Sequence, residues 1–344
     1  MNENKNLAAA TYVVLLTLGT IALMVIGQRL WVPLTWAFLF SFILHPLCCF
    51  LERRRIGRTT ASLFSVLIFC FVSGFILVYL IYEAVRILEH EPVLYSKMKE
   101  QIMDLMTKIQ AATGVTLYDP SAEGKSASDP ILKALPWLAG KVSVIGEDLV
   151  TLLLVPIYLF FMLAFRGNIK RFVRHRFERD HLEFLGLLLK NSRTSIQSYL
   201  SGTLMLTGLI ALITFVILLV LGVRHAFFFS VFYAVLSLIP YIGHLIAFVV
   251  ILLFAWVTKD SALSVVLIAV ALYIVNLSQE NFLRPKLIGN KMEMNSMVVF
   301  TAVVVGGMVW GLSGMVLFIP LLGVVKALTV SHHALKPYTT LFEP

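Results

Sequence analysis

Four polar residues at the end of a long apolar run have the chemistry of an ion or substrate site. Asn276, Gln279, Glu280 and Asn281 place one carboxylate and three amides within two helical turns. Such oxygens suit a hard cation or the hydroxyl group of a small molecule, and an ionisable residue at membrane depth is a functional candidate. The alternative is a cytoplasmic loop in which the acid only balances Arg284 and the base that follows it.

Two other apolar stretches carry helix breakers in their middle. Residues 225–258 are interrupted by Pro240, Tyr241 and Gly243. Residues 294–325 are interrupted by glycines, namely Gly306, Gly307, Gly311 and Gly314. Because proline removes a helix hydrogen bond and glycine lowers helix propensity, a chain reversal is predicted in each stretch. Broken helices commonly hold the sites of secondary transporters, whereas close helix packing or a plain loop is the structural alternative.

The sequence lacks the motifs of metal sites, disulfide frameworks and the common hydrolytic and nucleotide-binding enzymes. Cys48, Cys49 and Cys70 have neither CxxC nor Cys/His spacing, so no metal site or disulfide framework is predicted. Protease and hydrolase motifs are missing from the sequence, and the nearest phosphate-loop match lacks its first glycine. His244, inside the first break, could titrate near neutral pH, although a hydrogen-bonded structural histidine is the simpler interpretation. We therefore expect that the protein is not an enzyme and that it binds no cofactor.

Composition identifies the solvent that these residues face. Hydrophobic residues make up 59% of the 344 residues, charged residues only 14%, and the mean hydropathy is +0.89. Soluble domains have about 45–50% apolar and about 25% charged residues. A lipid bilayer accommodates such a surface because lipid-facing side chains should be apolar. The chain is therefore predicted to be an integral membrane protein.

The apolar stretches set the number of crossings. Six stretches fit a single span, which needs about 20 residues: 6–28, 30–50, 60–82, 145–165, 194–223 and 261–279. The two interrupted stretches have 34 and 32 residues, and a single helix of that length would extend near 50 Å across about 30 Å of hydrocarbon. Each is predicted to be an antiparallel pair that either crosses fully or forms a re-entrant hairpin. The predicted fold is all-α and polytopic, with about eight transmembrane helices.

Charges orient the chain. The net charge is +9, and the bases cluster in the loops around residues 52–58, 166–193 and 284–291, which the spans place on one side together with both termini. Positive loops stay cytoplasmic, so both termini are predicted to be cytoplasmic. The bases do not form a soluble face with stacking aromatics, so nucleic acid is not an expected partner.

The polar insertions divide the chain. The predicted parts are residues 1–82 with three transmembrane helices, 83–142 with an extracytoplasmic amphipathic helix, 143–166 with the fourth transmembrane helix, 167–199 as a basic cytoplasmic insertion, 200–331 as the transport core and 332–344 as a cytoplasmic tail. The basic insertion is either an interfacial or subunit-contact helix or an ordinary solvated loop.

Motifs in the last third of the chain resemble the autoinducer-2 exporter family of PerM-like permeases. They comprise the first break at residues 239–243, the run 280–289, the four glycines of the second break, Pro320 and Lys326. Within the run 280–289, Pro285 and Gly289 are the expected structural positions. Helix order, the large insertion and overall length are similar as well.

The resemblance implies a transporter in the cytoplasmic membrane of a bacterium or archaeon. Its family includes exporters of the quorum-sensing signal autoinducer-2 and, in some members, sodium/proton antiporters. We expect ion-gradient-driven export of a small polar metabolite or signalling molecule by a homo-oligomer embedded in lipid. The site residues would be the four polar residues at 276–281 together with Pro240, Tyr241 and Gly243. Sodium/proton antiport is the alternative, followed by a channel or a membrane scaffold.

Overall fold

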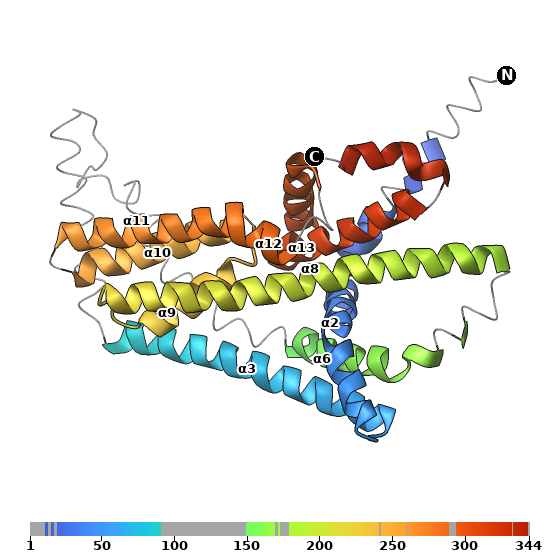
Figure 1. Ribbon diagram of the computed structural model, residues 1–344, viewed down its shortest axis with the longest axis horizontal. Coiled ribbons are helices and arrows are strands. Elements are labelled where there is room, and N and C mark those ends of the chain that lie inside the picture. Colours follow the sequence, from blue (N-terminus) through green and yellow to red (C-terminus); the bar gives the residue numbers. More distant parts are fainter. Residues whose placement is uncertain are drawn as a thin grey trace.

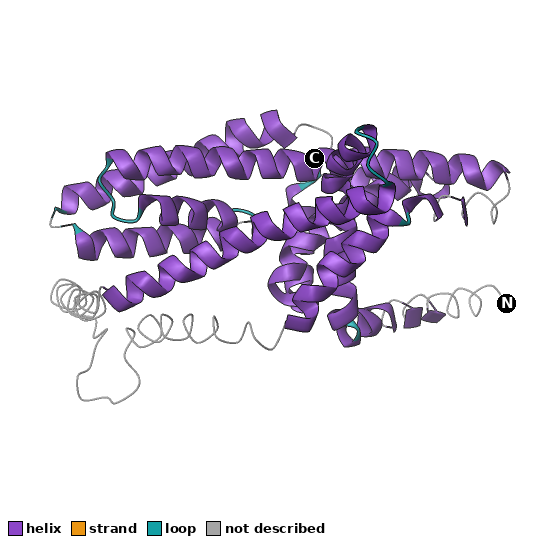
Figure 2. Cartoon of the chain, turned by 90° about the horizontal axis from the view of Figure 1, so that it is seen from below, coloured by secondary structure: helices purple, strands orange, loops and turns teal. Residues whose placement is uncertain are grey.

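The computed structural model describes residues 11–12, 15–16, 19–90, 149–168, 171–172, 179–240, 242–259, 261–288, 294–331 and 333–342. Every regular element in this part of the chain is a helix. Figure 2 shows these helices joined by short loops. The all-α prediction is therefore confirmed for the described residues.

The elements follow one another closely along the chain. The first half contains α2 (Gln28–Arg53), α3 (Arg58–His90), α6 (Leu149–Ala164) and α8 (Arg179–Val220). The second half contains α9 (Ala226–Leu236), α10 (Ile242–Thr258), α11 (Ala262–Ser278), the π-helical turn η2 (Gln279–Leu283), α12 (Arg284–Ile288), α13 (Ser296–Ser331) and the 3-10 helix η4 (His333–Phe342).

Five of the described helices are long and apolar enough to cross a bilayer, namely Gln28–Arg53, Arg58–Ile87, Ile196–Val220, Ala262–Ile288 and Ser296–Val330. Three shorter apolar helices, Leu153–Ala164, Ala226–Leu236 and Ile242–Thr258, accompany them. Their outer faces carry many exposed large apolar side chains, which water would not tolerate but lipid does. The chain is thus a multi-pass membrane protein.

The long helix α8 joins two packed regions (Figure 1). It contacts α13, α12 and α2 in one region and α9 and α11 in the other. The largest apolar core lies among α8, α9, α10 and α11 and includes Ile210, Tyr233, Ile251 and Ile268. A second core joins α2, α3 and α6, and a third joins α2, α8 and α13.

The connection from α8 to α9 is a tight helix end. Gly222 has φ +61, and its amide donates to the carbonyl of Leu219 at 3.0 Å while the amide of Val223 donates to that of Leu218 at 2.8 Å. This is the Schellman arrangement, which favours glycine in the left-handed conformation. The chain therefore leaves α8 and starts α9 within a few residues.

The chain reverses at the first predicted break. The amide of Ile242 donates to the carbonyl of Pro240 at 2.7 Å, and that of Gly243 donates to Ile239 at 3.1 Å. A Cβ on Gly243 would overlap the carbonyl of Leu236, the last residue of α9. The absence of a side chain at Gly243 thus lets α9 and α10 meet closely.

The chain also reverses at the second predicted break, inside α13. Trp310 and Gly311 leave the helical conformation there, and Gly311 has φ +59. A Cβ on Gly306 or Gly314 would overlap the backbone of the other glycine. Residues eight apart in a continuous helix are separated by about 12 Å along its axis. The two halves of α13 therefore form an antiparallel hairpin.

Several of the predicted segments lie wholly or partly outside the described residues. Residues 91–148, which include most of the predicted insertion and its amphipathic helix, lie outside the described residues. The first predicted span, 6–28, is described continuously only from residue 19. Residues 179–199 belong to α8 and continue directly into the next span. The stretch that ends the predicted basic insertion is therefore helical.

Candidate functional site

The polar residues at the end of α11 lie on a π-helical turn. η2 covers Gln279–Leu283 and is continuous with α11 before it and α12 after it. A π-helical turn is rare, and within α-helices it often marks a functional position. The sequence of this segment predicts an ordinary helix end, whereas the structure has a π-helical turn there.

Gln279 is the most unusual residue of this turn. Its side chain is fully buried, yet neither Oε1 nor Nε2 has a hydrogen-bond partner within the protein. A buried polar group left unpaired costs about 1–3 kcal/mol, so such groups are uncommon and need an explanation. A ligand or a water molecule that hydrogen-bonds to the amide would explain why it is buried.

Two further buried polar side chains lie near this turn, one beside Gln279 and the other beside the first. His244, in the first turn of α10, is buried and its Nε2 is also without a partner. Tyr233 of α9 is 1% exposed, and its ring packs edge-on against the His244 ring at 5.5 Å between centroids. His244 and Gln279 are neighbours, although no atom pair between them has hydrogen-bond geometry. We call Tyr233, His244 and Gln279 the buried polar cluster.

The α9–α10 hairpin is what positions this cluster. Tyr233 lies near the end of α9, and His244 directly follows the close approach at Gly243. The first break therefore brings an imidazole and a phenol to the π-helical turn. Imidazole and amide groups both donate and accept hydrogen bonds, so together they suit a small polar molecule with hydroxyl or carbonyl groups.

Glu280 and Asn281 occupy the outer side of the same turn. Both are exposed, and Glu280 accepts two hydrogen bonds from Arg284, at 2.9 Å and 3.0 Å. Asn281 donates to the backbone carbonyl of Leu277 at 2.9 Å. The acid does balance Arg284, as the alternative interpretation held, but within a continuous helix. Its charge still acts on Tyr233 and His244, so the outer carboxylate belongs to their electrostatic surroundings.

The remaining predicted positions are spread along the chain. Asn276 and Pro240 are half-buried and Pro285 is exposed in α12, whereas Tyr241 and Gly289 lie outside the described residues. In α13, Gly307 faces the side chain of Met315, Gly311 is exposed at the turn and Pro320 is buried. The α13 hairpin packs against α8 and α2, whereas the α9–α10 hairpin packs against α8 and α11. The two breaks therefore belong to different regions.

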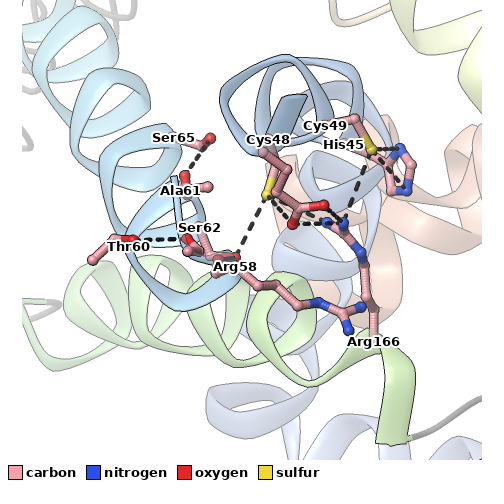
Figure 3. A network of polar contacts seen from close by, with 11 residues as sticks. His45, Cys48, Cys49, Arg58, Thr60, Ala61, Ser62, Ser65 and Arg166 are labelled. Carbon is pink, nitrogen blue, oxygen red and sulfur yellow. Dashed lines mark hydrogen bonds and ion pairs between the residues drawn. The ribbon is translucent and has the colours of Figure 1, made fainter. Parts of the chain in front are cut away.

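A second polar network lies at the junction of α2, α3 and α6. Figure 3 shows Arg166 extending from the end of α6 towards Cys48 and Cys49 of α2. Its Nη2 donates to both carboxylate oxygens of Glu52, at 2.7 Å and 2.5 Å, and its Nη1 donates to the Cys48 sulfur at 3.3 Å. The Cys48 sulfur also lies 3.5 Å from the hydroxyl of Ser62 on α3.

The network further stabilises the charged form of Arg166. Burial opposes that charge, but the hydrogen bond to Cys48 and the charge of Glu52 together raise the pKa of Arg166. In the sequence, Arg166 and Glu52 are recognisable only as charges in predicted loops. The spacing of Cys48 and Glu52, four residues apart on one helix face, was the signal available. In the described part of the chain, no group of three His, Cys, Asp or Glu side chains lies close enough to hold a metal.

Comparisons with known proteins agree with this architecture. The sequence model described as AI-2E family transporter matches residues 12–332. YrrI of Bacillus subtilis (strain 168), named as a proposed transport protein, is 26% identical over 176 residues, which are 51% of this chain and 49% of YrrI. Two similarly named proteins match over more of their length. YueF of the same strain is 23% identical over 87% of this chain and 83% of its own. YhhT of Escherichia coli (strain K12) is 22% identical over 86% and 82%.

Proposed function

The chain belongs to the AI-2E transporter family, and from that premise we propose that it is an ion-gradient-driven exporter of a small polar molecule. The observation that carries the proposal is the buried, unpartnered amide of Gln279 beside His244. A transported molecule that hydrogen-bonds to these atoms would offset the cost of burying them. Transport sites of secondary transporters commonly lie at such interrupted helices.

We place the substrate against the buried polar cluster, with the outer residues of η2 at its rim. Gln279 and His244 would bind hydroxyl or carbonyl groups of the substrate. Glu280, Asn281 and Asn276 would face the coupling cation or the substrate as it enters. Pro240, Tyr241 and Gly243 would shape the hairpin that closes over the site.

Helix lengths support a re-entrant arrangement for this hairpin. α9 has 11 residues and is therefore about 17 Å long, against about 30 Å of hydrocarbon. The hairpin would enter from one side of the bilayer and reverse beside η2. Broken backbone at this depth is tolerated where it lines a cavity or is buried in protein.

Flux through the purified protein tests the function. Metabolites released by cells with and without the protein identify a substrate, which is then loaded into proteoliposomes. A carrier gives saturable efflux that depends on an imposed sodium or proton gradient. Rapid efflux without saturation identifies a channel, and efflux equal to that of empty liposomes identifies a scaffold.

The topology gives a first prediction. We propose that both termini and the Arg54 loop are cytoplasmic and that Lys259 is extracytoplasmic. In a background without the three native cysteines, Lys259→Cys should react with an impermeant thiol reagent added to intact cells, whereas Arg54→Cys should react only after lysis. The reverse pattern would overturn the orientation.

A second prediction concerns Glu280. Its pair with Arg284 is exposed, so Glu280→Gln should change the free energy of unfolding by no more than about 0.5 kcal/mol. Because the substitution removes a negative charge at the rim, we expect a several-fold weaker apparent affinity for the coupling cation, measured as the concentration that half-saturates flux. Lys286→Gln, an exposed charge in α12, is the control. Equal cation dependence in wild type and Glu280→Gln would remove Glu280 from the ion site.

A further inference from the structure

A separate ionisable pair joins α3 to the start of α9, close to the opposite end of α3 from the Arg166 network. The carboxylate of Glu83 is buried, with 8% of the residue exposed. Its Oε1 lies 2.7 Å from Nδ1 of His225. Because an ionised carboxylate only accepts hydrogen bonds, Nδ1 carries the hydrogen and the neutral ring leaves Nε2 as its acceptor.

The backbone of His225 is held in a conformation that few residues adopt. It has φ 56 and ψ 34, in the left-handed region, and it occupies the N-cap position of α9 without a side-chain capping bond. Strained residues of this kind persist where their surroundings fix them, often at functional sites. Here the ring contacts Glu83 instead of capping its own helix.

Aromatic rings pack beside this pair, and solvent reaches one side of it. The Phe254 ring packs edge-on against the His225 ring, with 6.1 Å between the ring centroids. The Tyr79 ring packs against the ring of Phe227, two residues after His225, with 5.3 Å between the centroids. The His225 side chain is 23% exposed, so a proton can reach it from solvent.

Among the described residues of the neighbouring elements, few charged or titratable groups lie near the pair. On α3, Arg86 lies 3.6 Å from the other oxygen of Glu83, and the charge of Glu83 acts on the hydroxyl of Tyr79. Arg224 precedes His225 in the chain, and Lys259, just past α10, lies beside Gly222. Glu83 is thus a carboxylate among basic groups, and its partner is an imidazole, the side-chain type that most often serves as a proton-binding switch.

We propose that His225 and Glu83 form a proton-binding site that acts as a latch between α3 and α9. A proton taken up at Nε2 turns the hydrogen bond between a neutral ring and a carboxylate into a salt bridge between two opposite charges. Protonation adds the Coulomb attraction between imidazolium and carboxylate, so it tightens the contact and proton loss loosens it. Only its consequence for transport rests on the proposed function: α9 also carries Tyr233, so the latch would link proton binding to the substrate site.

Distance measurements on the full chain in lipid nanodiscs test the latch without substrate or flux. Nitroxide labels replace the exposed Val78 on α3 and Val235 on α9, in a background without the native cysteines. Double electron–electron resonance is recorded near about pH 5.5 and about pH 8.5, which bracket the range where histidines titrate. Wild type should shift towards the shorter distance at the lower pH.

His225→Asn is the matched variant, because its Nδ2 takes the place of Nδ1 and asparagine tolerates the left-handed region. It and Glu83→Gln should each give the same distance distribution at both pH values, while the control Lys286→Gln, an exposed charge in α12, should shift as wild type does. A pH-independent distance in wild type, or a wild-type shift in His225→Asn, would overturn the latch. Neither result bears on whether the protein transports, which the flux assay decides.

Discussion

Replacing Gln279 by leucine should reduce transport at least tenfold while leaving the protein as stable as wild type or more so. The amide is fully buried and both of its polar atoms lack partners. Exchanging such a group for an apolar one of similar size is often neutral or stabilising. Losing about 1.4 kcal/mol of substrate binding, the size of one good hydrogen bond, corresponds to a tenfold change.

Thr214 supplies the control for this prediction. Its hydroxyl on α8 is also buried and without a partner, but it lies outside the buried polar cluster. Thr214→Val should therefore keep or raise the unfolding temperature and leave flux unchanged. Both variants are compared by thermal unfolding and by flux in proteoliposomes. If Gln279→Leu transports like wild type, the unpaired amide is a structural defect and the proposed site is wrong.

The positions of the helices could be predicted from the sequence because the hydropathy of each segment reflects whether lipid or water surrounds it. The apolar stretch 30–50 became α2 at Gln28–Arg53, and the stretch 60–82 lies within α3 at Arg58–His90. Chain reversal at Pro240 and at the glycines of α13 followed from local chemistry alone, since these residues disfavour a continuing helix at any depth.

The sequence was less informative about which side chains from different helices meet in the folded protein. The π-helical turn at Gln279–Leu283 has the composition of an ordinary helix, so no pattern distinguished it. Arg166 looked like a topology signal because only the folded chain places Glu52 beside it. Similarly, the left-handed backbone of His225 depends on the Schellman turn before it and on Glu83, which is 142 residues away in sequence. Ionisable groups in this protein acquire their chemistry from helices that meet after folding.

The glycine at the α9–α10 turn gives the other large expected effect. Gly243→Ala should lower the unfolding free energy by about 3 kcal/mol and abolish most transport. The new Cβ would overlap the carbonyl of Leu236 and lie 3.2 Å from the Cβ of Ile239. Overpacking typically costs about 1–3 kcal/mol, and a clash with backbone has less room to relax than one with a side chain. Gly243→Leu should be more severe, because the hairpin must open to admit it.

Gly208 on α8 is the matched control, since a Cβ there would meet nothing within 4 Å. Gly208→Ala should hold or raise stability, because alanine favours a helix by about 1 kcal/mol over glycine. The two variants thus make the same chemical change, but only Gly243→Ala is predicted to lower the unfolding temperature. The turn also sets the place of His244, so flux should fall in Gly243→Ala even in the fraction that stays folded. Equal unfolding temperatures with normal flux in both would mean that the hairpin does not depend on the close approach, and that the buried polar cluster is positioned by other contacts.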